Sequence, residues 1–384
     1  MDAGNQAALA LLDMTAAFDA VDHEILLERM RRSYGVSGLA LAWLTSYLSG
    51  RSASVRLQNL QSSSYSSPHG VPQGSVLGPL LFILYVADIA DIADRHGIQS
   101  HFYADDAQLY LTCRRTEAIA TASRLTSCID EIAHWLASNR LMLNPTKTDL
   151  LWCTTKGCPP DVSVSPCGVN VRPSTDVRNL GVLFDATLSL KTHVTQLVGR
   201  CYGWLRRIRS CRRAPTQSAA TTLVNSFIIA RIDYCNSLLA GCGQQQIDKL
   251  QRVMNCAARV IYNCRRRDHV MPLLRDNLHW LRVRERILFK LCLMVYKALS
   301  GLAPSYITEL CVPVASIHPR SSLRSAAHGT LFVPRTRLEL GKRAFVVAAP
   351  AAWNSLPDDI RSAPTLDEFK QCLKTHLFIQ SYYL

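Results

Sequence analysis

Two adjacent aspartates, Asp105 and Asp106, lie in the segment HFYADDAQLY, residues 101–110. Aromatic and apolar residues on both sides favour two strands, and Ala-Asp-Asp between them is typical of a tight turn. Two carboxylates at one hairpin tip repel each other, and a divalent cation such as Mg²⁺ held between them and a third acid would relieve that repulsion. The alternative is a polar turn without chemistry, the common meaning of an isolated Asp-Asp pair.

A third acid is available upstream. The apolar run from Ala7 to Leu12 ends on Asp13, as a buried strand does when it delivers a carboxylate to a site. Between the two acidic segments lies the loop GVPQGSVLGP, residues 70–79, whose glycines permit close approach of a sugar or base to the backbone. The sequence thus predicts a site built from three separate segments.

These segments resemble motifs A, B and C of reverse transcriptases from non-LTR (LINE-type) retrotransposons, and are most similar to the jockey and chicken-repeat groups. They are DMTAAFD at 13–19, the loop at 70–79 and YADD at 103–106, in the family's order and at family-like spacing. Nearly the whole chain is covered by the resemblance. It implies an RNA-directed DNA polymerase whose substrates are an RNA template, a DNA primer and deoxynucleoside triphosphates, and it implies no particular protein partner.

The resemblance also implies roles for individual residues. Asp13 and Asp105 would hold two Mg²⁺ ions, for which Mn²⁺ is a substitute, and Asp106 would be the adjacent supporting acid. Asp19 is expected to be a structural or helix-start acid. In a motif D-like segment, Lys147 would protonate the leaving pyrophosphate, or it is a surface lysine.

The nucleotide contacts implied by the resemblance are three. Phe18 falls where the family places an aromatic ring beneath the sugar, where a bulky ring favours deoxynucleotides; the alternative is a core aromatic. Gln73 and Gly74 match residues that line the nucleotide and template groove, or they belong to a loop required only for folding. Further on, residues 179–185 resemble the hairpin that grips the primer.

The charge of the chain is unevenly distributed. Residues 1–200 hold 16 basic and 18 acidic side chains, net −2, whereas residues 201–384 hold 27 and 11, net +16. Arginine clusters of this kind bind phosphate oxygens with little sequence preference, although a solvated basic surface is the alternative. The expected nucleic-acid contacts are Arg206, Arg207, Arg209, Arg212, Arg213, Arg265, Arg266 and Arg267, with Arg282, Arg284 and Arg286 as further candidates.

The expected fold class is α+β, a right-hand polymerase palm followed by a mainly helical, basic thumb and a C-terminal region. The palm is assigned to residues 1–165, the primer-grip hairpin and thumb to 166–300, and the C-terminal region to 301–384. Within the palm, Asp22 is expected to cap a helix that ends near Gly35. Further elements expected there are a helix at 39–48, a strand at 51–60 and a helix at 80–92.

The fourteen cysteines show no tight pairs, and the apolar stretches are too short for a leader or a membrane span, so we expect an intracellular protein of the nucleus or cytoplasm with reduced thiols. Three segments, at 233–239, 278–281 and 352–357, resemble the family's downstream region without indicating chemistry. Cys256, Cys264, His269 and His279 are spaced too loosely for a typical zinc site.

The main departure from the family lies before motif A. Family members have a fingers region there, with basic residues that clamp the triphosphate, and usually an endonuclease before it, whereas about ten residues precede Asp13 here. Because correct positioning of the nucleotide contributes much of a polymerase's rate, a chain without this clamp is consistent with two hypotheses. One is an active palm and thumb lacking fingers and endonuclease; the other is a catalytically inactive, nucleic-acid-binding relic.

Overall fold

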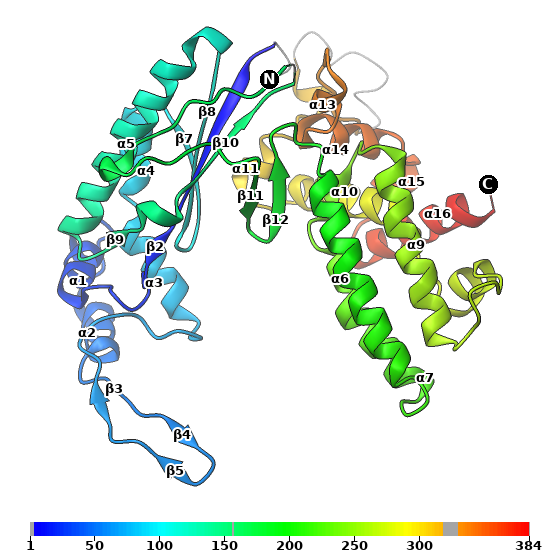
Figure 1. The fold of residues 1–384 in the computed structure, drawn as a ribbon, viewed down its shortest axis with the longest axis horizontal. Helices are drawn as coiled ribbons and strands as arrows, with labels where there is room; N and C mark the ends of the chain where they lie inside the picture. The colour runs from blue at the N-terminus through cyan, green and yellow to red at the C-terminus, as the bar shows by residue number, and fades with distance from the viewer. Residues whose placement is uncertain (1–3, 156, 318–328, 384) are drawn as a thin grey trace. The chain divides into compact units, whose positions relative to one another are not determined.

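The structure is a computed structural model, and it describes residues 4–155, 157–317 and 329–383. Contacts between Cα atoms divide the chain at Gly181 into two compact units, which we call unit 1, up to Gly181, and unit 2, from Val182. Both are visible in Figure 1 and are described separately. The observed mixture of strands in unit 1 with helices in both units agrees with the α+β prediction.

Unit 1 is built on a four-stranded antiparallel sheet in the order β10-β1-β8-β7. Its strands are β1 (Gln6–Leu12), β7 (Gln99–Tyr103), β8 (Asp106–Cys113) and β10 (Asp149–Cys153). Burial alternates along β1 and β8, so that Ala8, Ala10 and Leu12 share one buried face with Leu109 and Leu111. We call this the helix-covered face and the other, less buried side the open face.

Helices cover one face of this sheet and complete the core of unit 1. They are α1 (His23–Arg32), α2 (Gly38–Leu48), α3 (Leu77–Val86), α4 (Ile89–Arg95) and α5 (Ala118–Ser138). α5 contacts β1, β8 and α4, and its buried Leu125, Ile129 and Ile132 join the strand residues in one cluster. The Asp22 carboxylate accepts hydrogen bonds from the amides of residues 24 and 25, which confirms the predicted cap of α1.

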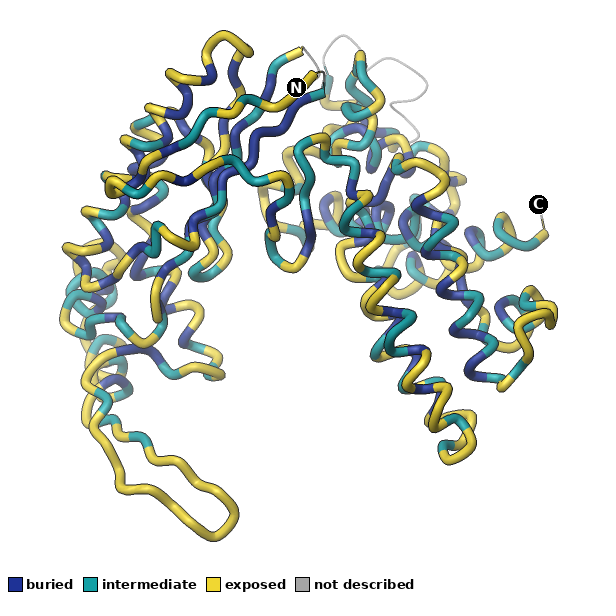
Figure 2. Tube along the Cα trace, in the orientation of Figure 1, coloured by how far each residue is buried: buried dark blue, intermediate teal, exposed yellow. Residues whose placement is uncertain are grey.

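Two predicted elements of unit 1 differ from the structure. The single strand expected at 51–60 is wrong: the segment forms two-residue strands β3 (Ser52–Ala53), β4 (Arg56–Leu57), β5 (Leu60–Gln61) and β6 (Tyr65–Ser66). This extension is exposed over nearly its whole length in Figure 2, so no core holds a longer strand. The helix expected at 80–92 is divided between α3 and α4, because the chain turns at Ala87 and Asp88.

Two further pairings of short strands lie outside the main sheet. β2 (Met14–Thr15) pairs with β9 (Met142–Leu143), directly after the first strand of the main sheet. The predicted hairpin at residues 179–185 has its arms in β11 (Asp176–Asn179) and β12 (Val182–Asp185), one on either side of Gly181. The segment that was expected to grip a primer therefore lies where the two units meet in the sequence.

Unit 2 is helical from Lys191 onward, in agreement with the mainly helical character expected of this part of the chain. Its longer helices are α6 (Lys191–Ser210), α7 (Gln217–Val224), α9 (Gln244–Ile261), α10 (Val283–Leu299), α14 (Phe345–Asn354) and α16 (Leu366–Tyr382). Four-residue helices lie between them: α8 (Ala230–Asp233), α11 (Ser305–Thr308), α13 (Glu339–Lys342) and α15 (Asp358–Arg361). α6 lies along α9, while α10 contacts α14 and α16. In the core, the rings of Tyr296 and Phe369 stack at 4.3 Å.

Within the described residues, none of the helices combines the length and apolar character required to cross a membrane. All fourteen cysteines lie in this part of the chain, and each has a free thiol. Burial raises the pKa of the Cys292 thiol to about 12 and that of Cys201 to about 11, so these two side chains behave as small apolar core residues.

Candidate functional site

The carboxylates of Asp13 and Asp106 come from the ends of two neighbouring strands. β1 and β8 are antiparallel, and the last pair in their register is Leu12 with Ala107, both buried on the helix-covered face. Because side chains alternate across a strand, Asp13 and Asp106 belong to the open face, and the same register sets them opposite each other. Two acids that are 93 positions apart in sequence thus lie at the same edge of the sheet.

Asp105 lies in the turn between β7 and β8. Tyr103 pairs with Asp106, which leaves Ala104 and Asp105 as the two turn residues, as predicted from the sequence. Ala104 has φ +54°, a left-handed conformation that is unfavourable for alanine by ~1 kcal/mol or more. Strained backbone of this kind is concentrated at functional sites, where the surrounding structure holds it in place.

The three carboxylates interact electrostatically. The pKa of the Asp106 carboxyl lies above its ordinary value because desolvation disfavours its charged form and the carboxylates of Asp105 and Asp13 repel it. Oxygen ligands of this type suit Mg²⁺ or Mn²⁺, which would relieve the repulsion. Throughout the described ranges, however, no group of three or more His, Cys, Asp or Glu side chains is gathered closely enough to hold a metal ion.

Lys147 lies beside Asp13. Met14 pairs with Leu143 between β2 and β9, and the amide of Asn144 donates to the Asp13 carbonyl at 2.9 Å. The following 3₁₀ turn, Pro145–Lys147, carries the Lys147 ammonium to 3.5 Å from Asp13 Oδ2. The structure therefore brings the motif D-like lysine to the acidic site, although its side chain is exposed.

The Gly-rich loop at 70–79 is docked on the segment that follows Asp13. The amides of Gly70 and Val71 donate to the carbonyls of Val21 and Phe18, both at 2.8 Å. Gln73 Nε2 donates to Asp19 Oδ1 at 2.9 Å. Asp19 thus has a structural contact, while the start of α1 is capped by Asp22 instead.

Phe18 and Gly74 lie near this junction in different environments. The ring of Phe18 is half-buried and stacks on Phe82 of α3, with 4.7 Å between centroids and 24° between planes. A helix of the core therefore fixes its orientation. Gly74 is exposed, has φ +79°, and a Cβ added there would meet no atom within 4 Å. The backbone at this position is open to close approach by a ligand.

Gly70 is a position in this loop where the backbone leaves no room for a side chain. Its φ is +85°, and a Cβ would lie 2.9 Å from both Cα and the carbonyl oxygen of Asp19. We expect Gly70→Ala to lower the free energy of unfolding by about 2 to 4 kcal/mol, because left-handed strain and overpacking add. Gly74→Ala, with a similar φ but open space, is the matched control in urea unfolding. Equal stability of the two variants would contradict the prediction.

The predicted basic cluster gathers at one end of unit 2. Arg206, Arg207 and Arg209 are exposed in the last turns of α6, and Arg265 to Arg267 are exposed just after α9. Arg212 joins these two helix ends, since its guanidinium donates to the carbonyls of Val260, Ile261 and Pro215. These contacts give Arg212 a structural role, whereas the exposed Arg213 and the other six arginines keep their side chains toward solvent.

Sequence reasoning missed a side-chain link on the open face of unit 1. Gln108, two residues after Asp106 on β8, exchanges two hydrogen bonds with Asn179 of β11, each 2.9 Å long. The pair fastens β11 to the strand that carries Asp106. The partners are 71 positions apart, so no local pattern pointed to them.

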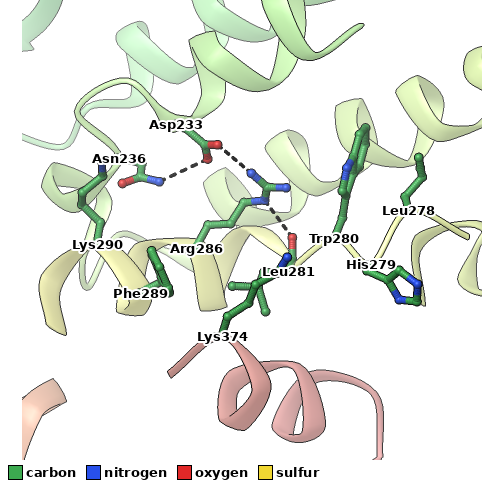
Figure 3. A pocket seen from close by; sticks show the side chains of 10 residues that line it. All are labelled: Asp233, Asn236, Leu278, His279, Trp280, Leu281, Arg286, Phe289, Lys290 and Lys374. Carbon is green, nitrogen blue, oxygen red and sulfur yellow. Dashed lines mark hydrogen bonds and ion pairs between the residues drawn. The ribbon is translucent and has the colours of Figure 1, made fainter. Parts of the chain in front are cut away.

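A pocket in unit 2 joins two of the segments to which the sequence assigned no chemistry. Figure 3 shows Asp233 from the first segment and Trp280 and Leu281 from the second around a cavity of ≈ 420 Å³. Arg286 Nη1 lies 2.6 Å from Asp233 Oδ2, and its Nε donates to the Leu281 carbonyl at 2.8 Å. The expectation of a phosphate contact is therefore wrong for Arg286, whose guanidinium is largely buried and holds the two segments together.

Comparison with known proteins gives one consistent family. Residues 2–184 match the reverse transcriptase (RNA-dependent DNA polymerase) family. The chain is 30% identical over 267 residues to a probable RNA-directed DNA polymerase from transposon BS of Drosophila melanogaster, covering 66% of this chain and 28% of that protein. The polymerase from transposon X-element of the same organism is 28% identical over 66% of this chain and 28% of its own length.

A further relative carries the group name indicated by the motifs. The RNA-directed DNA polymerase from the mobile element jockey of Drosophila melanogaster is 28% identical over 194 residues, 49% of this chain and 20% of that protein. The chain spans less than a third of the length of each of these relatives. With the three motif segments gathered around one sheet edge, the comparisons identify residues 2–184 as a reverse transcriptase region, and the chain is similar to the RNA-directed DNA polymerases of transposons.

Proposed function

We propose that this chain catalyses RNA-directed DNA synthesis, the transfer of a deoxynucleotide from its triphosphate to the 3′-hydroxyl of a DNA primer paired with an RNA template. The observation that carries the proposal is the meeting of Asp13, Asp105 and Asp106 at adjacent strand ends, where desolvation and the two neighbouring carboxylates raise the pKa of Asp106. Such a concentration of negative charge is unfavourable unless a cation is bound, which supports a metal-dependent site.

Reverse transcriptases generally use divalent metal ions, and the three carboxylates are the groups that would hold Mg²⁺, or Mn²⁺ in its place. When bound, the ions would lower the pKa of the primer hydroxyl and stabilise charge on the departing pyrophosphate. Lys147, which pairs with Asp13 at 3.5 Å, is placed in our proposal as the general acid for that pyrophosphate.

The incoming nucleotide would be bound by three residues around the docked loop. Phe18, held by its stacking on Phe82, would lie beneath the sugar and exclude a 2′-hydroxyl. Gln73 and Gly74 would line the groove, since Gln73 is fixed by Asp19 and Gly74 leaves its backbone open. This arrangement favours deoxynucleotides over ribonucleotides.

The rest of the chain would hold the nucleic acid. We assign the palm to residues 1–165, the primer-grip hairpin and thumb to 166–300 and a C-terminal region to 301–384. Seven exposed arginines would contact phosphates of the RNA and DNA strands without sequence preference: Arg206, Arg207, Arg209, Arg213, Arg265, Arg266 and Arg267. With these substrates, we propose a site of action in the nucleus or cytoplasm.

The experiment is extension of a labelled DNA primer on an RNA template with Mg²⁺ or Mn²⁺, comparing the chain with Asp105→Asn. Extension that disappears in the variant supports the proposal. The second candidate is a nucleic-acid-binding relic, favoured by the absence of an assembled metal-binding group within the described residues. If neither protein extends the primer, yet both bind the hybrid with an affinity that falls steeply with salt, the relic is the correct function.

A further inference from the structure

A long segment of unit 1 contains no acidic residue. Between Glu28 and Asp88 the sequence has five arginines and neither aspartate, glutamate nor lysine. Three of the arginines, at 29, 31 and 32, have carboxylate partners at the ends of the segment. In the described ranges no ion pair involves Arg51 or Arg56, so the middle of this segment carries uncompensated positive charge.

Helix α2 and the residues that follow it present a row of side chains at four-residue spacing. Trp43 and Tyr47 of α2 stack with 5.4 Å between their ring centroids and 11° between planes. The guanidinium of Arg51, four residues further on, lies 5.7 Å from the centroid of the Tyr47 ring. Trp43 and Tyr47 are four apart and share one face of α2, and Arg51, which follows the end of the helix at Leu48, continues the stack over Tyr47. We call these three flat groups the α2 ladder.

The α2 ladder is exposed at Trp43, while Tyr47 and Arg51 are half-buried. Trp43 is 57% accessible, and Leu39, one turn before it, is 91% accessible. A tryptophan in this position contributes little to a core, while the part of its ring that Tyr47 does not cover remains available for stacking. The β3–β6 extension that follows adds exposed Val55, Arg56 and Leu57 (Figure 2). Flat aromatic groups beside arginines that form no ion pair in the described ranges match the chemistry of bases joined by phosphates.

We propose that Trp43, Tyr47 and Arg51 form a stacking platform for the bases of an unpaired nucleic-acid strand, with Arg56 paired to its phosphates. The inference deepens the proposed function, because it adds a single-strand contact within unit 1 to the phosphate contacts of the basic thumb. Stacking tolerates every base, so the platform binds without sequence preference.

The test is binding of fluorescent 12-nucleotide single strands of RNA and DNA to the full chain, measured by anisotropy over a range of salt concentrations. Trp43→Ala is expected to weaken single-strand binding about 5- to 100-fold at every salt concentration, and Trp43→Phe to restore most of it. Arg56→Gln is expected to reduce the slope of affinity against salt instead. Comparison of the affinities for RNA and DNA shows which kind of strand the platform prefers.

Tyr383→Ala is the matched control, since this exposed tyrosine also lies under an arginine, with 5.6 Å from Arg275 to its ring, but belongs to unit 2. Tyr383→Ala is expected to bind the single strands with the same affinity as the unchanged chain. Crosslinking of a 4-thiouridine strand, mapped by mass spectrometry, is expected to label residues 43–56. Crosslinks confined to unit 2, with unchanged affinity of Trp43→Ala, would overturn the proposal.

Other outcomes separate this inference from the proposed function. If Trp43→Ala abolishes a dimer seen by light scattering and leaves strand binding intact, the ladder is a contact between copies and the proposal is wrong. Primer extension sensitive to Asp105→Asn, without any effect of Trp43→Ala on strand binding, would reject the platform alone. Ladder-dependent binding without extension would support the platform and reject the polymerase.

Discussion

Replacing Asp13 with asparagine is expected to lower the rate of primer extension at least about 10³-fold, ~4 kcal/mol of activation free energy. The substitution removes a negative charge and one of the oxygen ligands while preserving the shape of the side chain. It also breaks the ion pair with Lys147 and so affects two proposed groups together. Steady-state extension of a labelled primer measures the loss.

Two controls identify its cause. Because Asp13 is partly exposed and lies beyond β1, we expect the thermal midpoint of Asp13→Asn to stay close to that of the unchanged chain. Lys147→Gln, which removes only the lysine, is expected to cost less, about 10²-fold, with the loss in kcat. A rate for Asp13→Asn within tenfold of the unchanged chain would exclude Asp13 as a metal ligand.

The second large effect is expected at Asp185, at the entrance to α6. Its carboxylate accepts five hydrogen bonds, from the amides of Thr187, Ser189 and Leu190 at 3.1, 3.0 and 2.7 Å and from the hydroxyls of Thr187 and Ser189 at 2.5 and 3.1 Å. Asparagine can replace only part of this set. We expect Asp185→Asn to lower the free energy of unfolding by about 2 to 4 kcal/mol, measured by urea denaturation followed by circular dichroism.

The effect at Asp185 is expected to depend on pH. Burial by itself would raise the pKa of this carboxyl, but the hydrogen bonds from residues 187, 189 and 190 outweigh it and hold the pKa below its ordinary value. A carboxyl group whose pKa is lowered by folding stabilises the folded state at pH values above its pKa in the unfolded chain, about 4. This stabilisation is lost as the pH falls through the lower pKa of the folded state. The stability gap between the unchanged chain and Asp185→Asn should therefore be constant from pH 7 to 5 and close below about pH 4.

Glu309→Gln provides the comparison, because Glu309 is an exposed acid of unit 2 and its loss should leave the curve unchanged. If the difference in unfolding free energy between the unchanged chain and Asp185→Asn were as large at pH 2 as at pH 7, the ionised carboxylate would not be what stabilises this turn.

Much of unit 1 could be predicted because its signals are local. A run of apolar residues ending on Asp13, strand formers around Asp105 and a capping residue at 22 each determine structure within a few positions. The strand expected at 51–60 failed for the opposite reason. Its alternation is present in the sequence, but no second layer covers it, and strands without burial remain short and exposed.

The approach of the three candidate acids to one another could be predicted from the sequence, whereas the tertiary contacts around them could not. The spacing of the motifs singled out Asp13, Asp105 and Asp106, and the structure brings them to one sheet edge. The Gln108 to Asn179 pair and the burial of Arg286 depend on partners 71 and 53 positions away. A single sequence records each side chain without its tertiary partner, so an arginine that binds phosphate and one that joins two helices look alike.

Side chains of β1 point alternately to the two faces of the sheet, and the two sets of positions tolerate substitution to different degrees. Substitutions at Ala8, Ala10 and Leu12 must preserve volume, because they pack against helices. The intervening positions on the open face, Ala7, Leu9 and Leu11, are only half-buried and carry no such constraint. Substitutions at these three positions can therefore change the chemistry of the open face without repacking the core that holds Asp13 and Asp106 at the strand ends.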